Sequence, residues 1–514
     1  MSQKIDYSSS TLGDADTERR FEAALTLARS AQVAVEPHVV DGQELFEGAA
    51  IERQDPCHAG VVVGRAHEAD AAVVERAVAA AKAAAKGWRR TPYAERNELL
   101  RAASAELAGQ VPEIAALVSA ETGKTRLEAV GEVQEVLDMV AHYTHLMEAN
   151  EGYAVQQTST ESEKNYDVLV PVGVFGVISP FNFPAALLVG MTSAALVTGN
   201  TVVLKPSDKT PRSSGVIARI IAAHLPAGVL NVVHGGAETG KALAATDVDG
   251  IAFTGSSAVG WQLVETPRPN GLPRPVLAEM GGQNVAVVAA SADLDAAASG
   301  IVRSAFGLSG QKCSACRRVV VERSVADELA AKIVEQAEAL VLADPIDPAA
   351  GLGPVIDDAI AARVDEAIAQ ATADGRVLTG GRADDLKGNW FRPVVVTDLP
   401  IGHRLTREEL FAPFLTIIAV DSFEDAMTEA NAVEYGLSAG VFSADPEQVE
   451  TFLDEVEAGV LYVNRAAGAT TGAWPGVQSF CGWKRSGSTG KGGLGVHYLQ
   501  GFMREQSRTI VVDA

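Results

Sequence analysis

Hydrophobic residues recur at helical spacing along an alanine-rich stretch near the start of the chain. Between residues 71 and 107 apolar side chains return every three or four positions, with a break at Thr91-Pro92. The residue before a proline disfavours helical backbone, so we expect two amphipathic helices joined at this break. Residues 126–147 continue in the same style and predict a further helix.

After Pro171 the pattern changes to short apolar strands that alternate with helical segments. Four strand-like segments follow one another in this way, at residues 174–180, 200–207, 227–235 and 250–257. A second series of the same kind runs from Asn284 to about Val463. This alternation predicts an α/β fold with a doubly wound parallel sheet, which binds nucleotides at the carboxyl ends of its strands.

The end of the sequence has a different pattern. A glycine-rich loop is followed by TIVVD at residues 509–513, which has the composition of a single β-strand. A lone strand leaves its backbone groups unpaired, so we expect it to pair with a distant part of the chain. Residues 166–172 form another strand-like run.

Length and charge limit the class of protein. A chain of 514 residues is too long for one simple core, so we expect two or three packed units. Its 42 basic and 66 acidic residues give a net charge of −24. This balance argues against a nucleic acid partner, because phosphate binding needs clustered Lys and Arg. The acidic excess fits a salty cytoplasm, or equally an acidic surface from a GC-rich genome.

Cysteine content and apolar runs favour a cytoplasmic protein. Four cysteines in so long a chain do not make a disulfide framework and fit a reducing compartment. Residues 1–20 contain no apolar core of a signal peptide. The longest apolar run, Ala185 to Val197, is too short to span a bilayer. We therefore expect no membrane partner.

A candidate nucleophile lies in the segment GLSGQKCSACRRVVV. Cys313 occupies a glycine-bordered turn there, between a helical stretch and a strand. A thiol acts as a nucleophile when its environment favours the thiolate. Cys313 and Cys316 also have the spacing of a redox pair or half of a zinc site. No second CxxC and no histidine at ligand spacing accompany them, so we expect no metal. Packing alone remains a sufficient interpretation of Cys316.

Two other polar residues follow predicted strands and suit acyl chemistry. Glu279 lies in LAEMGGQN, where apolar neighbours and glycines would raise its pKa into the range useful for a general base. Asn182 lies in SPFNFP just after a strand, and its amide is suited to donate to a developing oxyanion. Taken singly, Glu279 is better interpreted as a capped surface acid.

Two segments predict a dinucleotide site. In FTGSSAVG, Gly255 and Ser256 stand between a strand and a helix, where backbone N–H groups can hold a phosphate. A single glycine-rich turn is a weak signal. In LKPSD, Lys205 and Asp208 follow a strand and can reach ribose hydroxyls.

Together these five segments resemble the aldehyde dehydrogenase superfamily, from about Ala71 to Val512. The resemblance implies an NAD(P)-binding domain over residues 1–152 and 173–279, and a second α/β catalytic domain over residues 280–478. It also implies a small β oligomerisation extension over residues 153–172 and 498–514, and therefore a homodimer or a higher homo-oligomer.

The same resemblance implies roles for individual residues. Cys313 would attack an aldehyde, Asn182 and the Cys313 backbone N–H would hold the oxyanion, and Glu279 would activate the water that releases the acid. The implied cofactor is NAD, with NADP possible, because Asp208 would repel a 2′-phosphate whereas Lys209 would tolerate one. The residues implied to contact the cofactor are Ser179, Pro180, Phe181, Lys205, Ser207, Asp208, Thr254, Gly255, Ser256, Glu409 and Phe411.

Within the superfamily the sequence is most similar to the branch that oxidises 1-pyrroline-5-carboxylate, whose open form is glutamate γ-semialdehyde. The similarity is carried by QKCSACRR, VNRAAGATTGAW and CGWKRSGSTGKGGLGVHYLQ. It implies a small-molecule aldehyde substrate that carries a carboxylate and an ammonium group. Lys312 has two interpretations: it attracts the carboxylate of this substrate, or it is a solvated surface lysine. The second interpretation is preferred. The residues implied to bind the substrate are Phe183, Ser314, Gly492, Gly493 and Gly495.

Other functions stay open at this point. Cys481 stands where a glycine is usual, and the loop after Lys491 is one residue longer than the pattern of that branch. Succinate or α-ketoglutarate semialdehyde, or a broad range of aldehydes, therefore remain alternatives. A hydrolase or acyltransferase would not need the cofactor segments. A catalytically silent binding protein on the same fold would not need the three residues implied to be catalytic.

Overall fold

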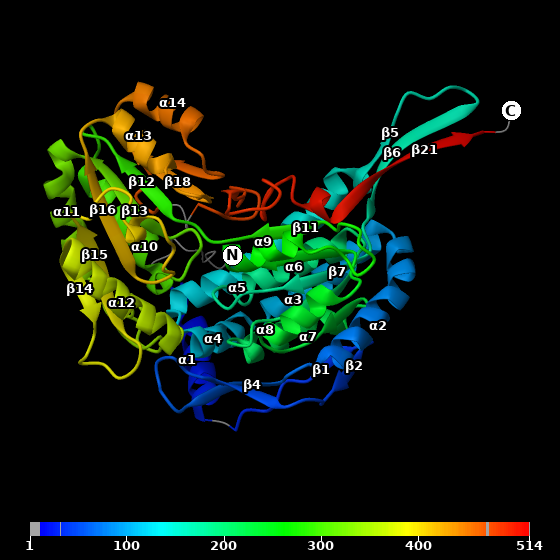
Figure 1. Ribbon diagram of the computed structural model, residues 1–514. Helices are drawn as coiled ribbons and strands as arrows, with labels where there is room; N and C mark the ends of the chain where they lie inside the picture. Colours follow the sequence, from blue (N-terminus) through cyan, green and yellow to red (C-terminus); the bar gives the residue numbers. More distant parts are fainter. Residues whose placement is uncertain (1–10, 31, 469–471, 513–514) are drawn as a thin grey trace.

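A seven-stranded sheet forms the centre of the larger lobe in the computed structural model, which describes residues 11–30, 32–468 and 472–512 (Figure 1). Five neighbouring strands run parallel, in the order β11-β10-β7-β8-β9, and β1 and β2 add an antiparallel edge. The predicted doubly wound parallel sheet is therefore confirmed. Its strands are β1 (His38–Val40), β2 (Gln43–Leu45), β7 (Val174–Ile178), β8 (Thr201–Lys205), β9 (Leu230–Val232), β10 (Gly250–Thr254) and β11 (Val276–Glu279).

Helices cover both faces of this sheet, and the predicted break at Thr91-Pro92 separates two of them. Asp70 caps the first of the pair by accepting a hydrogen bond from the Val73 N–H at 2.9 Å. The helices of this lobe are α1 (Ala15–Ser30), α2 (Ala71–Arg90), α3 (Tyr93–Ala108), α4 (Val111–Thr122), α5 (Arg126–Ala149), α6 (Ala186–Val197), α7 (Pro211–Ala223), α8 (Ala237–Ala245) and α9 (Ser257–Glu265).

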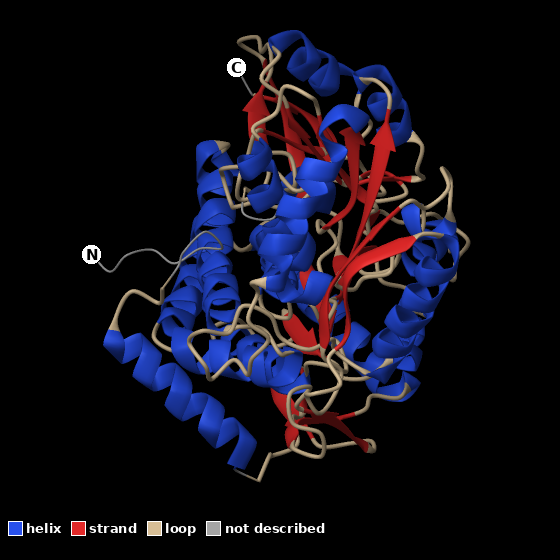
Figure 2. Ribbon diagram, turned by 90° about the vertical axis from the view of Figure 1, so that its left-hand side faces the viewer, coloured by secondary structure: helices blue, strands red, loops and turns tan. Residues whose placement is uncertain are grey.

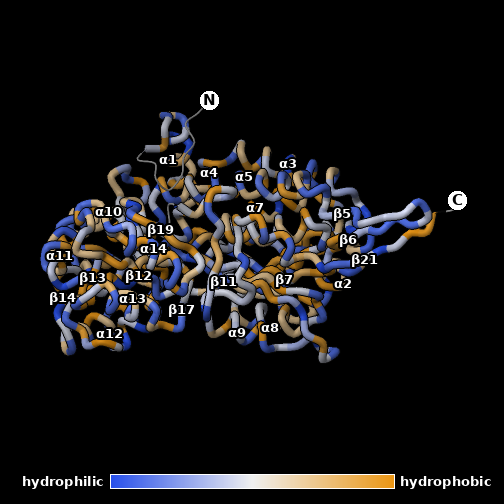
Figure 3. The backbone as a smooth tube through the Cα atoms, turned by 90° about the horizontal axis from the view of Figure 1, so that it is seen from above, coloured by the Kyte–Doolittle hydropathy of each residue, from blue (hydrophilic) through white to orange (hydrophobic). Residues whose placement is uncertain are grey.

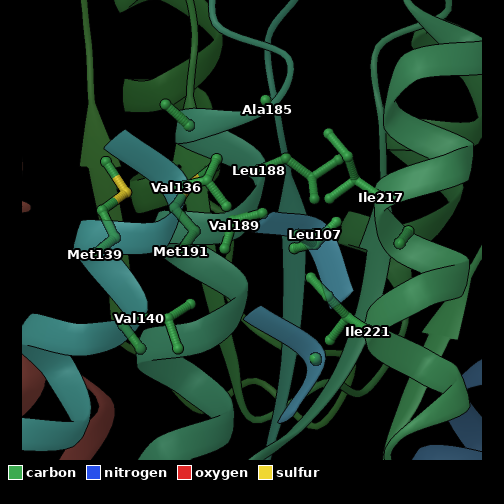
Figure 4. Packing of buried hydrophobic residues seen from close by; sticks show 14 of the residues in the cluster. Leu107, Val136, Met139, Val140, Ala185, Leu188, Val189, Met191, Ile217 and Ile221 are labelled. Carbon is green, nitrogen blue, oxygen red and sulfur yellow. The ribbon is translucent and has the colours of Figure 1, made fainter. Parts of the chain in front are cut away.

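Helix α6 is apolar on every side because it lies inside the lobe. Its side chains pack against α5 and α7, as Figure 4 shows for Val136, Met139, Leu188 and Ile217. A helix surrounded by protein has no solvent face, so its sequence need not alternate polar and apolar residues. The apolar run at Ala185–Val197 is therefore core. No helix in the described ranges is long and apolar enough to cross a membrane.

A second seven-stranded sheet, in the order β14-β15-β16-β13-β12-β18-β19, forms the smaller lobe at the left of Figure 1. All its strand pairs are parallel except β14–β15. The strands are β12 (Asn284–Val288), β13 (Cys316–Glu322), β14 (Arg376–Arg382), β15 (Phe391–Thr397), β16 (Phe414–Val420), β18 (Ser438–Phe442) and β19 (Val460–Val463). The helices around them are α10 (Leu294–Phe306), α11 (Arg323–Glu338), α12 (Asp358–Asp374), α13 (Phe423–Asn431) and α14 (Pro446–Glu455). Figure 2, in which the smaller lobe faces the viewer, shows strands with helices on either side of them.

A three-stranded arm extends away from the larger lobe (Figures 1 and 3). It is formed by β5 (Ala154–Gln156), β6 (Glu163–Pro171) and β21 (Met503–Val511), with β6 in the middle. The terminal strand thus pairs with a distant segment, as its sequence predicts, from Met503 opposite Pro171 to Val511 opposite Glu163. Shorter pairs join β3 (Ala50–Gln54) to β4 (Val62–His67), and β17 (Tyr435–Gly436) to β20 (Trp483–Lys484).

The three main sheets fall inside the segments given above for the three domains. Residues 1–10, 31, 469–471 and 513–514 of those segments lie outside the described residues. The domain boundaries at residues 152, 172, 279 and 478 remain a proposal about which parts fold as units.

Candidate active site

The segment before Cys313 has an unusual backbone that presents this residue between two lobes. Leu308 and Ser309 have φ of 49° and 53°, and Gly310 has φ of 66°. Two non-glycine residues in succession in the left-handed region are strained, and such strain persists only where surrounding contacts fix it. The Leu308 N–H donates to Glu128 Oε1 at 2.7 Å, and the Ser309 hydroxyl donates to the Gly353 carbonyl oxygen. Asn284, at the start of β12, holds the residues that follow this turn. Its side-chain amide donates to the carbonyl oxygens of Cys313 at 2.7 Å and Ala315 at 2.8 Å.

Arg317 fixes the same segment from the other side. Its buried guanidinium donates to the carbonyl oxygens of Gly310, Lys312 (3.2 Å) and Ala412 (2.6 Å). The first two acceptors precede the nucleophile and the third follows Phe411. Arg317 therefore ties the Cys313 segment to the segment that carries two predicted cofactor contacts.

Glu279 ends strand β11 and lies in a desolvated position. Burial raises the pKa of its carboxyl group to about 7, and a hydrogen bond from the Gly493 N–H acts against this shift. That N–H donates to Glu279 Oε1 at 2.8 Å. The backbone carbonyl of Glu279 accepts the Gly255 N–H at 3.1 Å. A carboxyl group with this pKa can exchange protons near neutral pH, which suits a general base.

The thiol of Cys313 is protonated at neutral pH in this environment. Burial raises its pKa to about 12, and the nearby carboxylates of Glu409 and Glu279 add to the shift. A thiolate is the better nucleophile, so the predicted role of Cys313 would require a group that removes its proton or a positive charge that stabilises the anion.

Asn182 lies close to the nucleophile segment. Its side-chain amide is buried and donates to the Gln311 carbonyl oxygen at 3.1 Å. The chain just beyond it is held by Glu132, whose Oε1 accepts the N–H groups of Ala185 (2.7 Å) and Ala186 (3.1 Å). The partner of Glu132 in a buried ion pair is Lys124. The position of Asn182 is thus fixed by its own hydrogen bond to Gln311 and by the contacts of Glu132, on α5, with the chain that follows it.

One cavity brings two of the three predicted catalytic residues together with several predicted substrate residues, whereas Asn182 does not border it. Cys313, Glu279, Ser314, Phe183 and Gly493 all border it. Apolar side chains form most of the remaining wall, from α5, α6 and the loops before and after β20: Met139, Tyr143, Ala186, Leu187, Met191, Ala473, Phe480, Leu494 and Tyr498. Glu135 adds a second carboxylate to this wall.

Gly492 and Gly495 do not border this cavity, in contrast to the prediction for them. Both are packed against backbone or side chains of the preceding loop. A Cβ on Gly492 would lie 1.6 Å from the Phe480 carbonyl oxygen, and one on Gly495 would lie 2.4 Å from Ser479 Oγ. These glycines allow the close approach of two loop segments.

The preferred interpretation of Lys312 as a solvated surface residue is wrong. Its side chain is only 6% exposed and its Nζ lies 3.5 Å from a carboxylate oxygen of Glu128. Hydrophobicity patterns could not reveal this, because the partner lies far away in the sequence on α5.

The predicted phosphate and ribose residues gather at the carboxyl ends of β8 and β10. Thr254 ends β10, and Ser256 caps α9 by accepting the Val259 N–H at 3.4 Å. Lys205 ends β8, where burial lowers the pKa of its ammonium group to about 8. Its Nζ donates to the carbonyl oxygens of Pro206 and Gly235 at 2.8 and 2.9 Å. Ser207 is buried next to it, and the side chain of Asp208 is exposed.

The other predicted cofactor residues meet where the two lobes face each other. The rings of Phe181 and Phe411 form an edge-to-face pair with centroids 6.0 Å apart. Ser179 and Pro180 immediately precede Phe181. Glu409 Oε1 accepts the Gly282 N–H at 3.0 Å, and burial raises the pKa of Glu409. A dinucleotide held by all these residues would lie between the lobes.

Five residues with evident roles at this site escape the sequence patterns. Asn284 and Arg317 fix the nucleophile segment, whereas Glu135, Tyr143 and Leu494 border the cavity. Glu135 could have been found from the sequence only as one of the acidic residues among the apolar positions of α5. The stretch Ala469–Thr471, part of a predicted motif, lies outside the described residues. Among the described residues no cluster of three or more His, Cys, Asp or Glu side chains could hold a metal ion.

Comparisons with known proteins agree with this geometry. A family model described as the aldehyde dehydrogenase family matches residues 45–507. A 1-pyrroline-5-carboxylate dehydrogenase of Geobacillus sp. (strain WCH70) is 37% identical over 505 residues, which cover 96% of each chain. The crystal structure of a 1-pyrroline-5-carboxylate dehydrogenase from Thermus with bound NAD is 30% identical and has a TM-score of 0.94, covering 100% of this chain and 99% of its own.

A longer relative contains the same fold as one part. The crystal structure of proline utilization A from Bdellovibrio bacteriovorus is 32% identical with a TM-score of 0.92. The match covers 96% of the chain described above and 52% of the Bdellovibrio protein.

Proposed function

The chain belongs to the aldehyde dehydrogenase family, and we propose that it oxidises glutamate γ-semialdehyde, the open form of 1-pyrroline-5-carboxylate, to glutamate. The names of the Geobacillus and Thermus relatives support this substrate, and the NAD bound to the Thermus enzyme supports NAD as the acceptor. A place in proline catabolism follows from the same substrate. The observation that carries the proposal is the shared cavity, because it joins a thiol, a carboxyl group of raised pKa and a second carboxylate.

In the proposed reaction, the Cys313 thiol loses its proton to solvent, and Sγ forms a bond to the aldehyde carbon as the carbon–oxygen π bond opens. The aldehyde oxygen gains negative charge and accepts hydrogen bonds from the Asn182 amide and the Cys313 backbone N–H. NAD, when bound, accepts the hydride that leaves this carbon, and a thioester on Cys313 remains. Glu279 then takes a proton from water as the water oxygen attacks the thioester carbon, which releases the acid and restores the thiol.

The residues between the lobes fit a dinucleotide. The N-terminus of α9 offers backbone N–H groups and a favourable dipole to phosphate oxygens, next to Thr254, Gly255 and Ser256. We assign the exposed Asp208, beyond β8, to the ribose hydroxyls. NADP remains a possible second cofactor because Lys209 follows directly, although its Nζ is paired with Asp357.

The cavity supports a substrate that carries both charges. We assign the ammonium group of the semialdehyde to Glu135 and its aliphatic part to Phe183. The carboxylate is assigned to the Ser314 hydroxyl, since Ser314 follows the nucleophile directly and borders the cavity. The Gly493 N–H, which donates to Glu279 in this structure, would have to be released before it could serve the substrate.

Steady-state kinetics with the purified enzyme and NAD test the proposal, with NADH absorbance as the signal. We expect kcat/KM for glutamate γ-semialdehyde to exceed that for propanal or benzaldehyde by at least ~10²-fold, since charge-assisted hydrogen bonds contribute about 1.5–3 kcal/mol each. Equal values for the three aldehydes would overturn the substrate assignment and favour a broad specificity.

We also propose a homodimer or a higher homo-oligomer in the cytoplasm. The support for assembly is the arm, whose strand β21 has one unpaired edge and exposes Ile510 and Val511. The support for a reducing compartment is the four cysteines, which are all free thiols.

A further inference from the structure

Leu494 has a backbone conformation that a leucine rarely adopts. Its φ is +67°, whereas its neighbours Gly492, Gly493 and Gly495 do not have positive φ. A glycine would take this conformation without steric cost, but a branched side chain makes it strained. The sequence therefore places the one large residue of a glycine-rich loop at the position where a glycine would be easiest to accommodate.

Hydrogen bonds on both sides fix this residue. The Leu494 N–H donates to the Tyr143 hydroxyl at 3.1 Å, and its carbonyl oxygen accepts the Gly476 N–H at 3.2 Å. Tyr143 belongs to α5 and is itself buried. The loop cannot rotate Leu494 out of its position without breaking both bonds.

The leucine side chain lies at the substrate cavity. It is 5% exposed and borders the cavity together with Cys313 and Ser314. Met139, Leu187 and Met191 also form the apolar wall, but they project from the helices α5 and α6, where ordinary helical backbone explains their presence. Helical packing does not require Leu494. Strain maintained at a cavity wall by two hydrogen bonds indicates a role for the side chain in that cavity.

We propose that Leu494 limits the length of the aldehyde that fits beside Cys313. This inference rests on the proposed function and specifies its substrate range. The leucine occupies volume that a longer substrate would need, so glutamate γ-semialdehyde fits and its homologue with one more methylene is disfavoured. One methylene in an apolar pocket changes kcat/KM by about 10- to 200-fold.

The test compares substrates of different length in the full-length enzyme and in the variants Leu494→Ala and Leu494→Gly. The readout is the ratio of kcat/KM for glutamate γ-semialdehyde to that for the longer homologue, with propanal and hexanal as an uncharged pair. We expect each variant to shift both ratios toward the longer aldehyde by at least ~10-fold. Leu494→Gly relieves the backbone strain, so it keeps the test informative if Leu494→Ala folds poorly.

Leu499→Ala is the matched control, because Leu499 is a fully buried leucine of the same region that does not border the cavity. This control should lower stability and leave both ratios unchanged. Unchanged ratios in both Leu494 variants, or an equal shift in Leu499→Ala, would overturn the inference. A further outcome is that the native enzyme and the variants oxidise neither semialdehyde while the variants still shift the hexanal-to-propanal ratio. That result would support the role of Leu494 in limiting aldehyde length and would refute glutamate γ-semialdehyde as the substrate.

Discussion

Burial raises the pKa of two titrating groups at the candidate active site, and this shift suits the role proposed for Glu279 but not the one proposed for Cys313. The thiol of Cys313 has a pKa of about 12 and stays protonated, whereas the carboxyl group of Glu279 has a pKa of about 7 and is half ionised at neutral pH. Both shifts arise first from burial. In the proposed reaction the Cys313 thiol must therefore lose its proton as Sγ attacks the aldehyde, or beforehand if a nearby group stabilises the thiolate.

The pKa of Glu279 leads to a prediction for the pH profile. Only its ionised form can take a proton from water, so deacylation should fall as pH drops below about 7. Glu279→Gln should slow turnover by ~10²-fold or more and remove this acidic limb, while a burst of NADH marks intact acylation. Cys313→Ala is the control, since it should show neither burst nor turnover. A full-rate Cys313→Ala enzyme would contradict the mechanism.

Ser314 provides a second residue-scale prediction. Ser314→Ala should reduce kcat/KM for glutamate γ-semialdehyde by about 10-fold, because it removes a hydrogen bond to a charged group. The same variant should leave propanal oxidation nearly unchanged. Equal losses for both substrates would mean that the Ser314 side chain packs beside the nucleophile and does not contact the carboxylate.

At the scale of elements, periodic segments could be predicted and irregular ones could not. The alternating strands of both sheets and the pairing of the terminal strand follow from local hydrophobic patterns. The left-handed turn at Leu308-Ser309 is held by distant residues, because the Leu308 N–H donates to Glu128 Oε1 and the Ser309 hydroxyl donates to the Gly353 carbonyl oxygen. No local pattern contains these contacts. In the loop after Lys491 the resemblance implies that Gly492, Gly493 and Gly495 bind the substrate, whereas the cavity wall there is formed by Gly493 and Leu494.

The arm allows a prediction about assembly. Ile510 and Val511 on β21 are 52% and 70% exposed, which is unfavourable unless another surface covers them. The double substitution Ile510→Lys and Val511→Lys should convert the proposed oligomer to a smaller species in light scattering. Ser507→Lys adds a charge to an exposed position on the same strand and should assemble normally. A monomeric native enzyme would refute the role of the arm.

At the scale of the whole molecule, the large negative net charge is expected to influence the stability of the fold. A net charge of −24 produces repulsion over the surface, which salt screens as the Debye length falls from about 10 Å at 0.1 M to about 3 Å at 1 M. We expect the melting temperature to rise by several degrees over this range of KCl. Sorbitol at equal osmolality controls for effects unrelated to ions. A melting temperature that falls or stays constant would favour the simple acidic-surface interpretation.

The arm also constrains how the protein is made. Strand β6 leaves the ribosome more than three hundred residues before its partner β21, and at about 5–20 residues per second this delay lasts roughly tens of seconds. During that interval one edge of β6 has no native partner and is a potential template for aggregation. In the proposed oligomer, assembly through the arm would therefore wait until translation is almost finished. A chain that stops early lacks the strand that completes the arm, and on the same proposal it would not join the oligomer.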